Sequence, residues 1–235
     1  LSDDKAVLAA EVTFYPIGYN PQAYTAIFGN TDLWRAAFNS FYVAIIGCVL
    51  GLIGTCVAAY PMAYGNFYGK KLYVIIIMFT MWFNAGIVPL FLTIRQLGLY
   101  DSLWALILNS MITAYNVVII RSYFSSIPFS VIESARIDGA TDYRILFQLV
   151  IPLSKPVLAT VALWLIVGHW NDYLNPLVLI HSQEHKTLQL FLKELVLNAE
   201  TSTSNLASVN DATNKGVAAL SQQLKNGVMV VSMVP

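Results

Sequence analysis

Four long apolar segments constrain the fold of this chain more than any other feature. They cover about residues 36–60, 72–92, 103–123 and 157–180. About 20 mainly apolar residues make a helix that is long enough to cross the hydrocarbon core of a bilayer. A helix also satisfies its own backbone hydrogen bonds, as a lipid environment requires. The segments therefore predict an all-α integral membrane protein, built as a bundle of transmembrane helices.

The composition agrees with a membrane environment. Hydrophobic residues make up 57% of the chain and charged residues 11%, and the mean hydropathy is +0.63. These values lie well to the apolar side of soluble domains. The formal net charge is zero, so no electrostatic argument favours a nucleic acid as partner. We expect a lipid bilayer around the chain and no bound nucleic acid.

We expect the sequence to be truncated at both ends. A fifth apolar run, residues 228–235, begins a last span but is too short to complete it. The chain opens at Leu1 with no initiator methionine and no apolar region of a signal peptide. We expect a single transmembrane domain over residues 1–235 that lacks a preceding helix and most of its last one, with Thr31 or Asp32 capping the first helix.

A polar loop, residues 124–156, lies between the third and fourth apolar segments. Pro128 suits the first turn of a helix, where its missing N–H would be unpaired in any case. No helix breaker follows until Gly139, which can adopt the left-handed conformation that ends many helices. The first half of the loop is therefore predicted to be a short helix closed by a tight turn.

The second half of the loop predicts another short helix at the membrane surface. Thr141 or Asp142 can cap it. Its apolar face is expected to consist of Tyr143, Leu146, Phe147 and Val150. Pro152 disfavours helical backbone at Ile151, so we expect the helix to close there.

The residue spacing in this loop resembles the cytoplasmic EAA loop of ABC importer permeases. Glu133 and Ala135 are followed by a glycine four residues later, an aliphatic residue ten further on, and a proline three beyond it. The residues that carry the resemblance, and that it assigns to ATPase coupling, are Glu133, Ser134, Ala135, Asp138, Gly139, Ala140 and Pro152. Ser134, Leu149 and Ile151 depart from the usual residues but preserve size and apolarity. The plainer alternative is an amphipathic loop that only caps the bundle.

Three further motifs resemble maltose-type carbohydrate permeases. They are Asn39-Ser40, then Arg95 with Gly98-Leu99, then the run from Gly168 to Pro176. The likeness extends from about residue 30 to the end of the chain. It implies a type I ABC importer permease fold with six spans when complete, in the bacterial cytoplasmic membrane.

The resemblance also implies how such a chain functions. Expected partners are a second homologous permease, a dimer of ATPase subunits, an extracytoplasmic solute-binding protein and a carbohydrate, in particular an oligosaccharide of the alginate or pectin type. The chain is not expected to be an enzyme or to bind a cofactor, because ATP and Mg belong to the ATPase. In the family, the loop glutamate approaches a basic group of the ATPase, and ATPase closure drives alternating access.

Several polar residues within the apolar segments are candidates for the substrate pathway, since polar groups at such depth are often functional. They are Asn84, His169, Asn171, Asp172 and Asn175. Three roles remain open for those in the fourth segment: hydrogen bonds to sugar hydroxyls, contacts between helices, or satisfaction of backbone groups freed by a kink at Pro176. The nearby aromatic residues, Trp164, Trp170 and Tyr173, suit either sugar stacking or packing.

Other patterns give no sign of a catalytic or metal site. Cys48 and Cys56 are eight residues apart, or about 12 Å along a helix, too far for a disulfide, which favours a packing role. The histidines lack metal-ligand spacing. Residues 65–71 hold three residues between glycines where a phosphate-binding loop needs four.

The longest segment without a span is the outer loop, residues 181–225. Its start, Leu188, Leu190, Phe191, Leu192 and Leu195, predicts an amphipathic helix, and residues 199–215 predict a flexible loop. This loop could contact a binding protein or be a plain connector. The alternative function is an ion-gradient-driven secondary transporter or channel, but the chain shows no inverted repeat, and Asp172 is its one carboxylate in mid-span.

Overall fold

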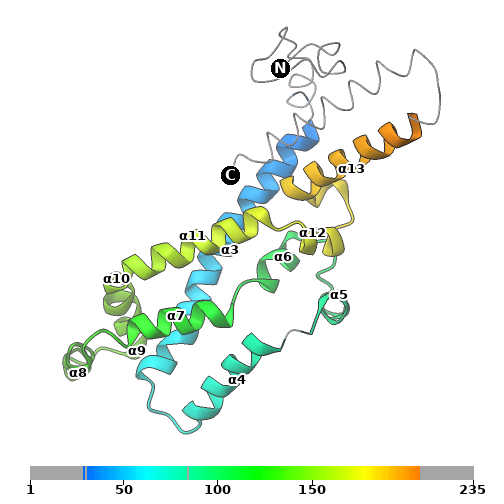
Figure 1. The fold of residues 1–235 in the computed structure, drawn as a ribbon. Coiled ribbons are helices and arrows are strands. Elements are labelled where there is room, and N and C mark those ends of the chain that lie inside the picture. The colour runs from blue at the N-terminus through cyan, green and yellow to red at the C-terminus, as the bar shows by residue number, and fades with distance from the viewer. Residues whose placement is uncertain (1–28, 30, 84, 207–235) are drawn as a thin grey trace, which may run out of the picture. The chain divides into compact units, whose positions relative to one another are not determined.

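The computed structural model describes residue 29, residues 31–83 and residues 85–206 (Figure 1). Over these ranges the chain is helical and contains no strand. The predicted all-α class is therefore confirmed. The predicted start of a last span at residues 228–235 lies outside the described residues.

The helices follow one another with short connections. In chain order they are α3 (Thr31–Tyr64), α4 (Lys70–Trp82), α5 (Ile87–Gln96), α6 (Leu103–Asn109), α7 (Ala114–Phe124), α8 (Phe129–Ile137), α9 (Asp142–Ile145), the π-helix η1 (Leu146–Val150), α10 (Ile151–Leu153), α11 (Lys155–Asn171), α12 (Leu174–Leu179), the 3-10 helix η2 (Gln183–His185) and α13 (Leu188–Leu206).

Among the described residues, α3 alone is long and apolar enough to cross a membrane as a single helix. Up to four spans result if each of three bent helix pairs is taken as one span. Two of these pairs, α4 with α5 and α6 with α7, fall on predicted segments. The predicted fourth segment is divided between α11 and α12. The ring of Pro176 would clash with the carbonyl four residues earlier in a continuous helix, which accounts for a break at Asp172 and Tyr173.

The chain divides into two units, and the larger is residues 41–170. Its core is shared by α3, α7, α8, α9, η1 and α11. The best-buried side chains there include Met62, Ile120, Phe124, Ile132, Ile145, Val150 and Val161. Cys48 and Cys56 are buried free thiols in this core, so their predicted packing role is confirmed. Because lipid tails are themselves apolar, the hydrophobic effect does not drive helices together in a bilayer, and close packing of this kind holds them instead.

The other unit joins residues up to Ser40 with residues from Asn171 onward. The Asn39 side-chain amide donates hydrogen bonds to the carbonyls of Glu184 and Lys186, at 2.7 and 3.0 Å. Ser40 Oγ accepts from the Leu188 amide at 2.8 Å. The Asn39-Ser40 pair therefore anchors the segment that leads into α13.

The amphipathic helix predicted after residue 187 is confirmed, because Leu188, Leu190, Phe191 and Leu192 of α13 are all buried. The helix is longer than predicted and continues to Leu206. The expected flexible loop is therefore wrong over residues 199–206. Its remaining part, residues 207–215, lies outside the described residues.

Candidate functional site

The turn after α8 has the geometry predicted for the coupling loop. Gly139 has a φ of +78°, in the left-handed region that favours glycine. The Gly139 amide donates to the Arg136 carbonyl and the Ala140 amide to the Ala135 carbonyl, both at 3.0 Å. These two bonds form the Schellman motif that closes a helix. The predicted left-handed helix end at Gly139 is confirmed.

The outward face of α8 is open. Ile132 is the buried residue of this helix and is fully enclosed in the core. Glu133, Ser134, Asp138 and Gly139 are exposed, while Ala135 and Ala140 are half-buried. Within the part of the chain that the structure describes, no side chain pairs with Glu133. α8 and its end therefore present Glu133 and Asp138 outward, while Ile132 fixes this helix to the bundle.

The second helix of the loop differs from its predicted form. α9, η1 and α10 run on to Leu153, and Ile151 is helical with φ −60° and ψ −49°. The helix thus passes through Pro152, which is exposed, and the prediction that it closes at Ile151 was wrong. The chain turns instead beyond Leu153, where Asp142–Leu153 and α11 meet at 85°. The wider π turn of η1 relieves the crowding between the proline ring and the preceding turn.

The predicted apolar face of this helix was also partly wrong. Leu146 and Val150 are buried, but Tyr143 is 77% exposed and Phe147 46%. Ile145 is buried instead. A π turn holds more residues than an α turn, so the regular α-helical spacing fails where η1 begins.

A polar link joins the loop to α3. Asp142 Oδ1 accepts a hydrogen bond from Tyr60 Oη at 3.0 Å and one from Arg136 Nη2 at 3.2 Å. The bond to Asp142 raises the pKa of Arg136 above its ordinary value. Sequence reasoning missed Tyr60, because a tyrosine near the end of an apolar segment reads as an ordinary interfacial residue.

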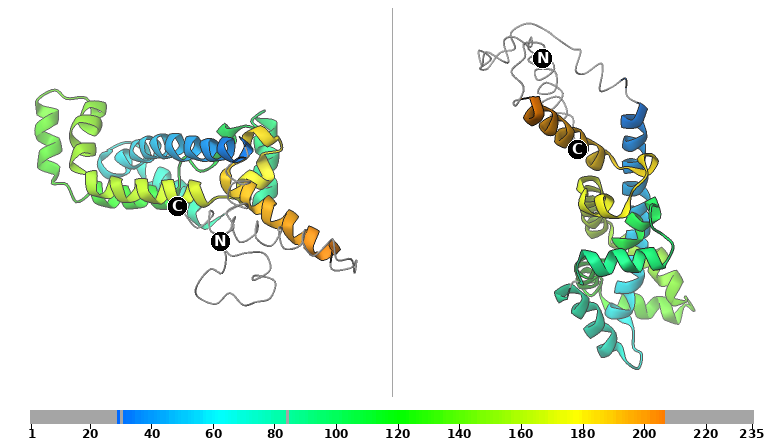
Figure 2. Two further views of the ribbon diagram at one scale, coloured as in Figure 1. Left: turned by 90° about the horizontal axis from the view of Figure 1, so that it is seen from above. Right: turned by 90° about the vertical axis from the view of Figure 1, so that its right-hand side faces the viewer.

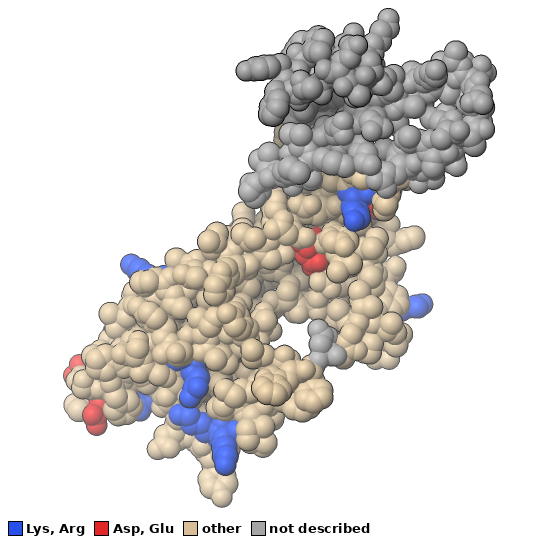
Figure 3. Space-filling model, in the orientation of Figure 1, with Lys and Arg blue, Asp and Glu red and all other residues tan. Residues whose placement is uncertain are grey.

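The same residues border a cavity of about 490 Å³. Its lining comes from the end of α3, the 65–67 connection and the loop helices: Val57, Tyr60, Pro61, Gly65, Asn66, Phe67, Arg136, Asp142, Tyr143 and Leu146. Figure 2 shows the loop helices lying side by side at the end of the unit that α7 and α11 reach. Figure 3 shows acidic side chains over α8 and basic ones over the start of α4. Charge therefore gathers at this end, as expected of a membrane–water boundary.

Among the polar candidates, His169 is a buried contact between helices. It is 8% exposed, and its Nδ1 lies 3.5 Å from Ser110 Oγ. A Cβ added to Gly47 would lie 2.5 Å from His169 Nε2. The absence of a side chain at Gly47 therefore makes room for the His169 ring. This packing favours a helix-contact role for His169.

Asp172 and Asn175 are hydrogen-bonded to each other at the start of α12. Asp172 accepts from the Asn175 amide at 3.2 Å and from its side-chain nitrogen at 2.8 Å. This is the role expected of a polar residue beside a helix break. Asn171 is exposed at the end of α11, and the candidate Asn84 lies outside the described residues.

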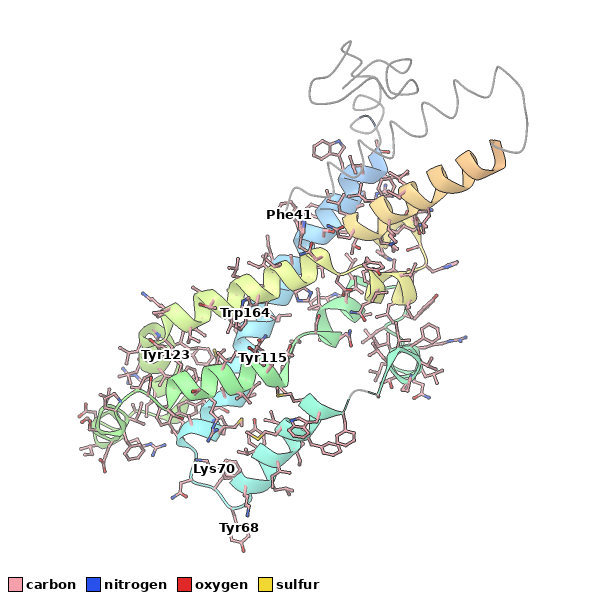
Figure 4. All side chains as sticks on the ribbon, viewed as in Figure 1. Phe41, Tyr68, Lys70, Tyr115, Tyr123 and Trp164 are labelled. Carbon is pink, nitrogen blue, oxygen red and sulfur yellow. The ribbon has the colours of Figure 1, made fainter. Side chains whose placement is uncertain are left out.

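The three aromatic residues of this region each contact a neighbour in their own unit. Figure 4 shows Trp164 beside Tyr115, with ring centroids 5.9 Å apart. Trp170 meets Phe41 edge to face at 5.3 Å. Lys193 Nζ lies 4.9 Å from the Tyr173 ring centroid. These contacts favour the packing interpretation over sugar stacking.

Comparisons with known proteins agree on one family. Residues 47–209 match the family described as the binding-protein-dependent transport system inner membrane component. The polygalacturonan/rhamnogalacturonan transport system permease protein YtcP of Bacillus subtilis (strain 168) is 31% identical over 229 residues, which are 97% of this chain and 79% of that protein. The protein LplC of the same organism is 33% identical over 94% of this chain and 73% of that protein.

A solved structure gives the same result at the level of the fold. A chain from the crystal structure of a bacterial ABC transporter involved in the import of the acidic polysaccharide alginate is 33% identical, with a TM-score of 0.81. The likeness covers 98% of this chain and 83% of that chain. The resemblance first inferred from the loop is confirmed: this chain belongs to the family of binding-protein-dependent transport system inner membrane components, the permeases of ABC importers.

Proposed function

We propose that this chain is one of the two permease subunits of an ATP-driven importer for an oligosaccharide, and that α8 is its contact with an ATPase. The observation that carries the proposal is the exposed face of α8 around Glu133, on a helix closed by Gly139 and fixed to the bundle by Ile132. A rigid, outward-facing helix of this kind suits a mechanical contact.

The mechanism follows from this geometry. ATP and Mg are bound by a partner ATPase dimer, and this chain supplies no catalytic group. Closure of the ATPase moves α8, and the movement passes through Ile132 and the loop into the helices of residues 41–170. The spans then rock between inward-facing and outward-facing states, as rigid-body gating requires. Glu133, Ser134, Ala135, Asp138, Gly139, Ala140 and Pro152 form the proposed coupling surface.

The proposed substrate is an oligosaccharide from an acidic plant or algal polysaccharide. The support is that one relative is a polygalacturonan/rhamnogalacturonan transport system permease, and that the similar solved structure is of a transporter involved in alginate import. An extracytoplasmic solute-binding protein would deliver this sugar, and a second permease would complete the pathway. The proposed location is the bacterial cytoplasmic membrane.

The experiment is purification of the full-length protein from its native membrane with its partners retained. ATP hydrolysis is then measured with and without the binding protein and a digest of polygalacturonan or of alginate. Recovery of an ATPase whose hydrolysis one digest stimulates supports the proposal. A chain that purifies without any ATPase contradicts it.

Glu133 provides a matched pair of variants. Glu133→Lys reverses the charge that we expect to face a basic group, whereas Glu133→Gln removes the charge and keeps the shape. We expect Glu133→Lys to insert normally and to lose stimulated hydrolysis, with a smaller loss for Glu133→Gln.

The alternative function is a secondary transporter. Uptake that is driven by a proton or sodium gradient and unaffected by ATP depletion would support it. The pairing of Asp172 with Asn175 disfavours this alternative.

A further inference from the structure

Three elements of the permease meet at one carboxylate oxygen. Asp142 Oδ1 accepts from Tyr60 Oη at 3.0 Å and from Arg136 Nη2 at 3.2 Å. Tyr60 belongs to α3, Arg136 to the last turn of α8, and Asp142 is the first residue of α9. A single acceptor therefore connects both helices of the coupling loop to a long helix of the bundle.

Side-chain packing is interrupted at this place. The cavity of about 490 Å³ lies between the end of α3 and the loop, and Tyr60, Arg136 and Asp142 are part of its wall. α3 and the loop helices share the core of this unit, but the cavity interrupts their packing near Tyr60. There, the hydrogen bonds to Asp142 connect the two directly.

Of the two bonds, the one to Tyr60 is better suited to transmit movement. The Tyr60 ring is 7% exposed and enters the core as well as the cavity wall, so it is held by packing and has few rotatable bonds. The Arg136–Asp142 pair is more exposed, with side chains 39% and 63% accessible. Exposed ion pairs of this kind are weak on their own, and this pair mainly orients the carboxylate toward Tyr60.

From this arrangement we infer that Tyr60 and Asp142 are positioning residues that transmit movement of the coupling loop to α3. The inference rests on the proposed function, because it assumes that an ATPase moves α8. It adds a route separate from Ile132: the loop pulls on α3 one helical turn before that helix ends at Tyr64.

The test uses Cys56, a native thiol that lies in α3 four residues before Tyr60 and is 2% exposed. In the purified importer with its ATPase, the rate of Cys56 labelling by N-ethylmaleimide is measured by mass spectrometry, without nucleotide and after trapping with ATP and vanadate. The variants are Tyr60→Phe, which removes one hydroxyl, and Asp142→Ala. Asp142→Asn keeps an oxygen that can accept from both donors.

Tyr73→Phe is the matched control. The Tyr73 hydroxyl also donates to α3, to the Ala58 carbonyl at 3.0 Å, but Tyr73 lies in α4 and outside the loop. The same chemical change therefore removes a hydrogen bond of similar length without touching the inferred route. It separates loss of transmission from general loosening of α3.

We expect the labelling rate of the unmodified importer to differ between the two nucleotide states. In Tyr60→Phe that difference should shrink about threefold to tenfold, the factor by which loss of one hydrogen bond changes an equilibrium. In Asp142→Ala, which loses the bonds from both Tyr60 and Arg136, it should shrink at least as much. Tyr73→Phe and Asp142→Asn should keep the difference. A residue that only stabilised the fold would change labelling in both states alike.

Two results would overturn the inference while leaving the proposed function intact. One is a full nucleotide-dependent difference in Tyr60→Phe. The other is an unmodified importer that hydrolyses ATP and shows no difference at Cys56. Failure of the proposed function is distinct, because no ATPase would then purify with the chain.

Discussion

The turn at Gly139 gives the sharpest test of how the loop is built. At its φ of +78°, a residue with a Cβ pays a backbone cost of about 1–2 kcal/mol. A Cβ added there meets nothing within 4 Å, so no steric cost is added. Gly139→Ala should therefore destabilise the loop by about 1 kcal/mol once the lower entropy of the unfolded alanine chain is counted. Gly139→Asn should cost less, since asparagine tolerates this conformation.

Gly139→Pro should prevent the turn from forming, whereas the alanine and asparagine variants should only destabilise it. Proline fixes φ near −65°, about 140° from the observed value. It also removes the N–H that donates to the Arg136 carbonyl, a bond worth about 1 kcal/mol. The Schellman turn cannot form, and α8 loses its fixed direction. We expect the protein to insert into the membrane and transport to stop.

The assay is thermal unfolding of the detergent-solubilised importer together with ATP-driven uptake. The expected order of damage is Asn, then Ala, then Pro. Gly168→Ala is the control, because a Cβ there also meets nothing within 4 Å but Gly168 lies inside α11, where alanine is favoured. An effect of Gly139→Asn as large as that of Gly139→Pro would refute the reasoning, because it would mean that backbone conformation is not what the glycine supplies.

Substitutions at Ile132, at Gly47 with His169, and at Asp172 test three further contacts. Ile132→Ala should cost about 2–5 kcal/mol of stability and uncouple hydrolysis from uptake, whereas Ile132→Val should cost about 0.5–1.5 kcal/mol; equal unfolding midpoints would count against the anchoring role. Gly47→Ala would place a Cβ 2.5 Å from His169 Nε2 and should cost about 1–3 kcal/mol, a loss that a second change, His169→Ala, should partly relieve in the same unfolding assay. Asp172→Ala should weaken the start of α12 by about 0.5–2 kcal/mol and lower uptake of every substrate alike, so a changed substrate preference would show that Asp172 contacts the sugar.

Sequence patterns predicted the loop well where its backbone conformation depends on residues that are close in the sequence. The need for a left-handed residue makes Gly139 visible in the sequence, and the structure places it at φ +78°. The amphipathic start of α13 was likewise visible, because its leucines recur with helical spacing. The second loop helix was predicted less well: a π turn has no residue signature, so neither passage through Pro152 nor exposure of Tyr143 could be foreseen.

Contacts between distant residues were hidden for another reason. Tyr60 and Asp142 are 82 positions apart in the sequence. The identities of the two residues do not indicate that their side chains pair. The same holds for Gly47, whose small size matters only because His169 lies against it. Asn39-Ser40 was recognised as a motif, but its role in anchoring the segment before α13 required the structure.

The central claim is that α8 contacts an ATPase, and the most direct measurement is photo-crosslinking from that helix. A photoreactive residue replaces Ile137, which is 81% exposed on α8, and separately Leu163, which is 60% exposed on α11. In native membranes, the account predicts a crosslink from position 137 to an ATP-binding subunit and none to that subunit from position 163. A crosslink from position 137 to lipid alone, in membranes where the importer is active, would contradict it.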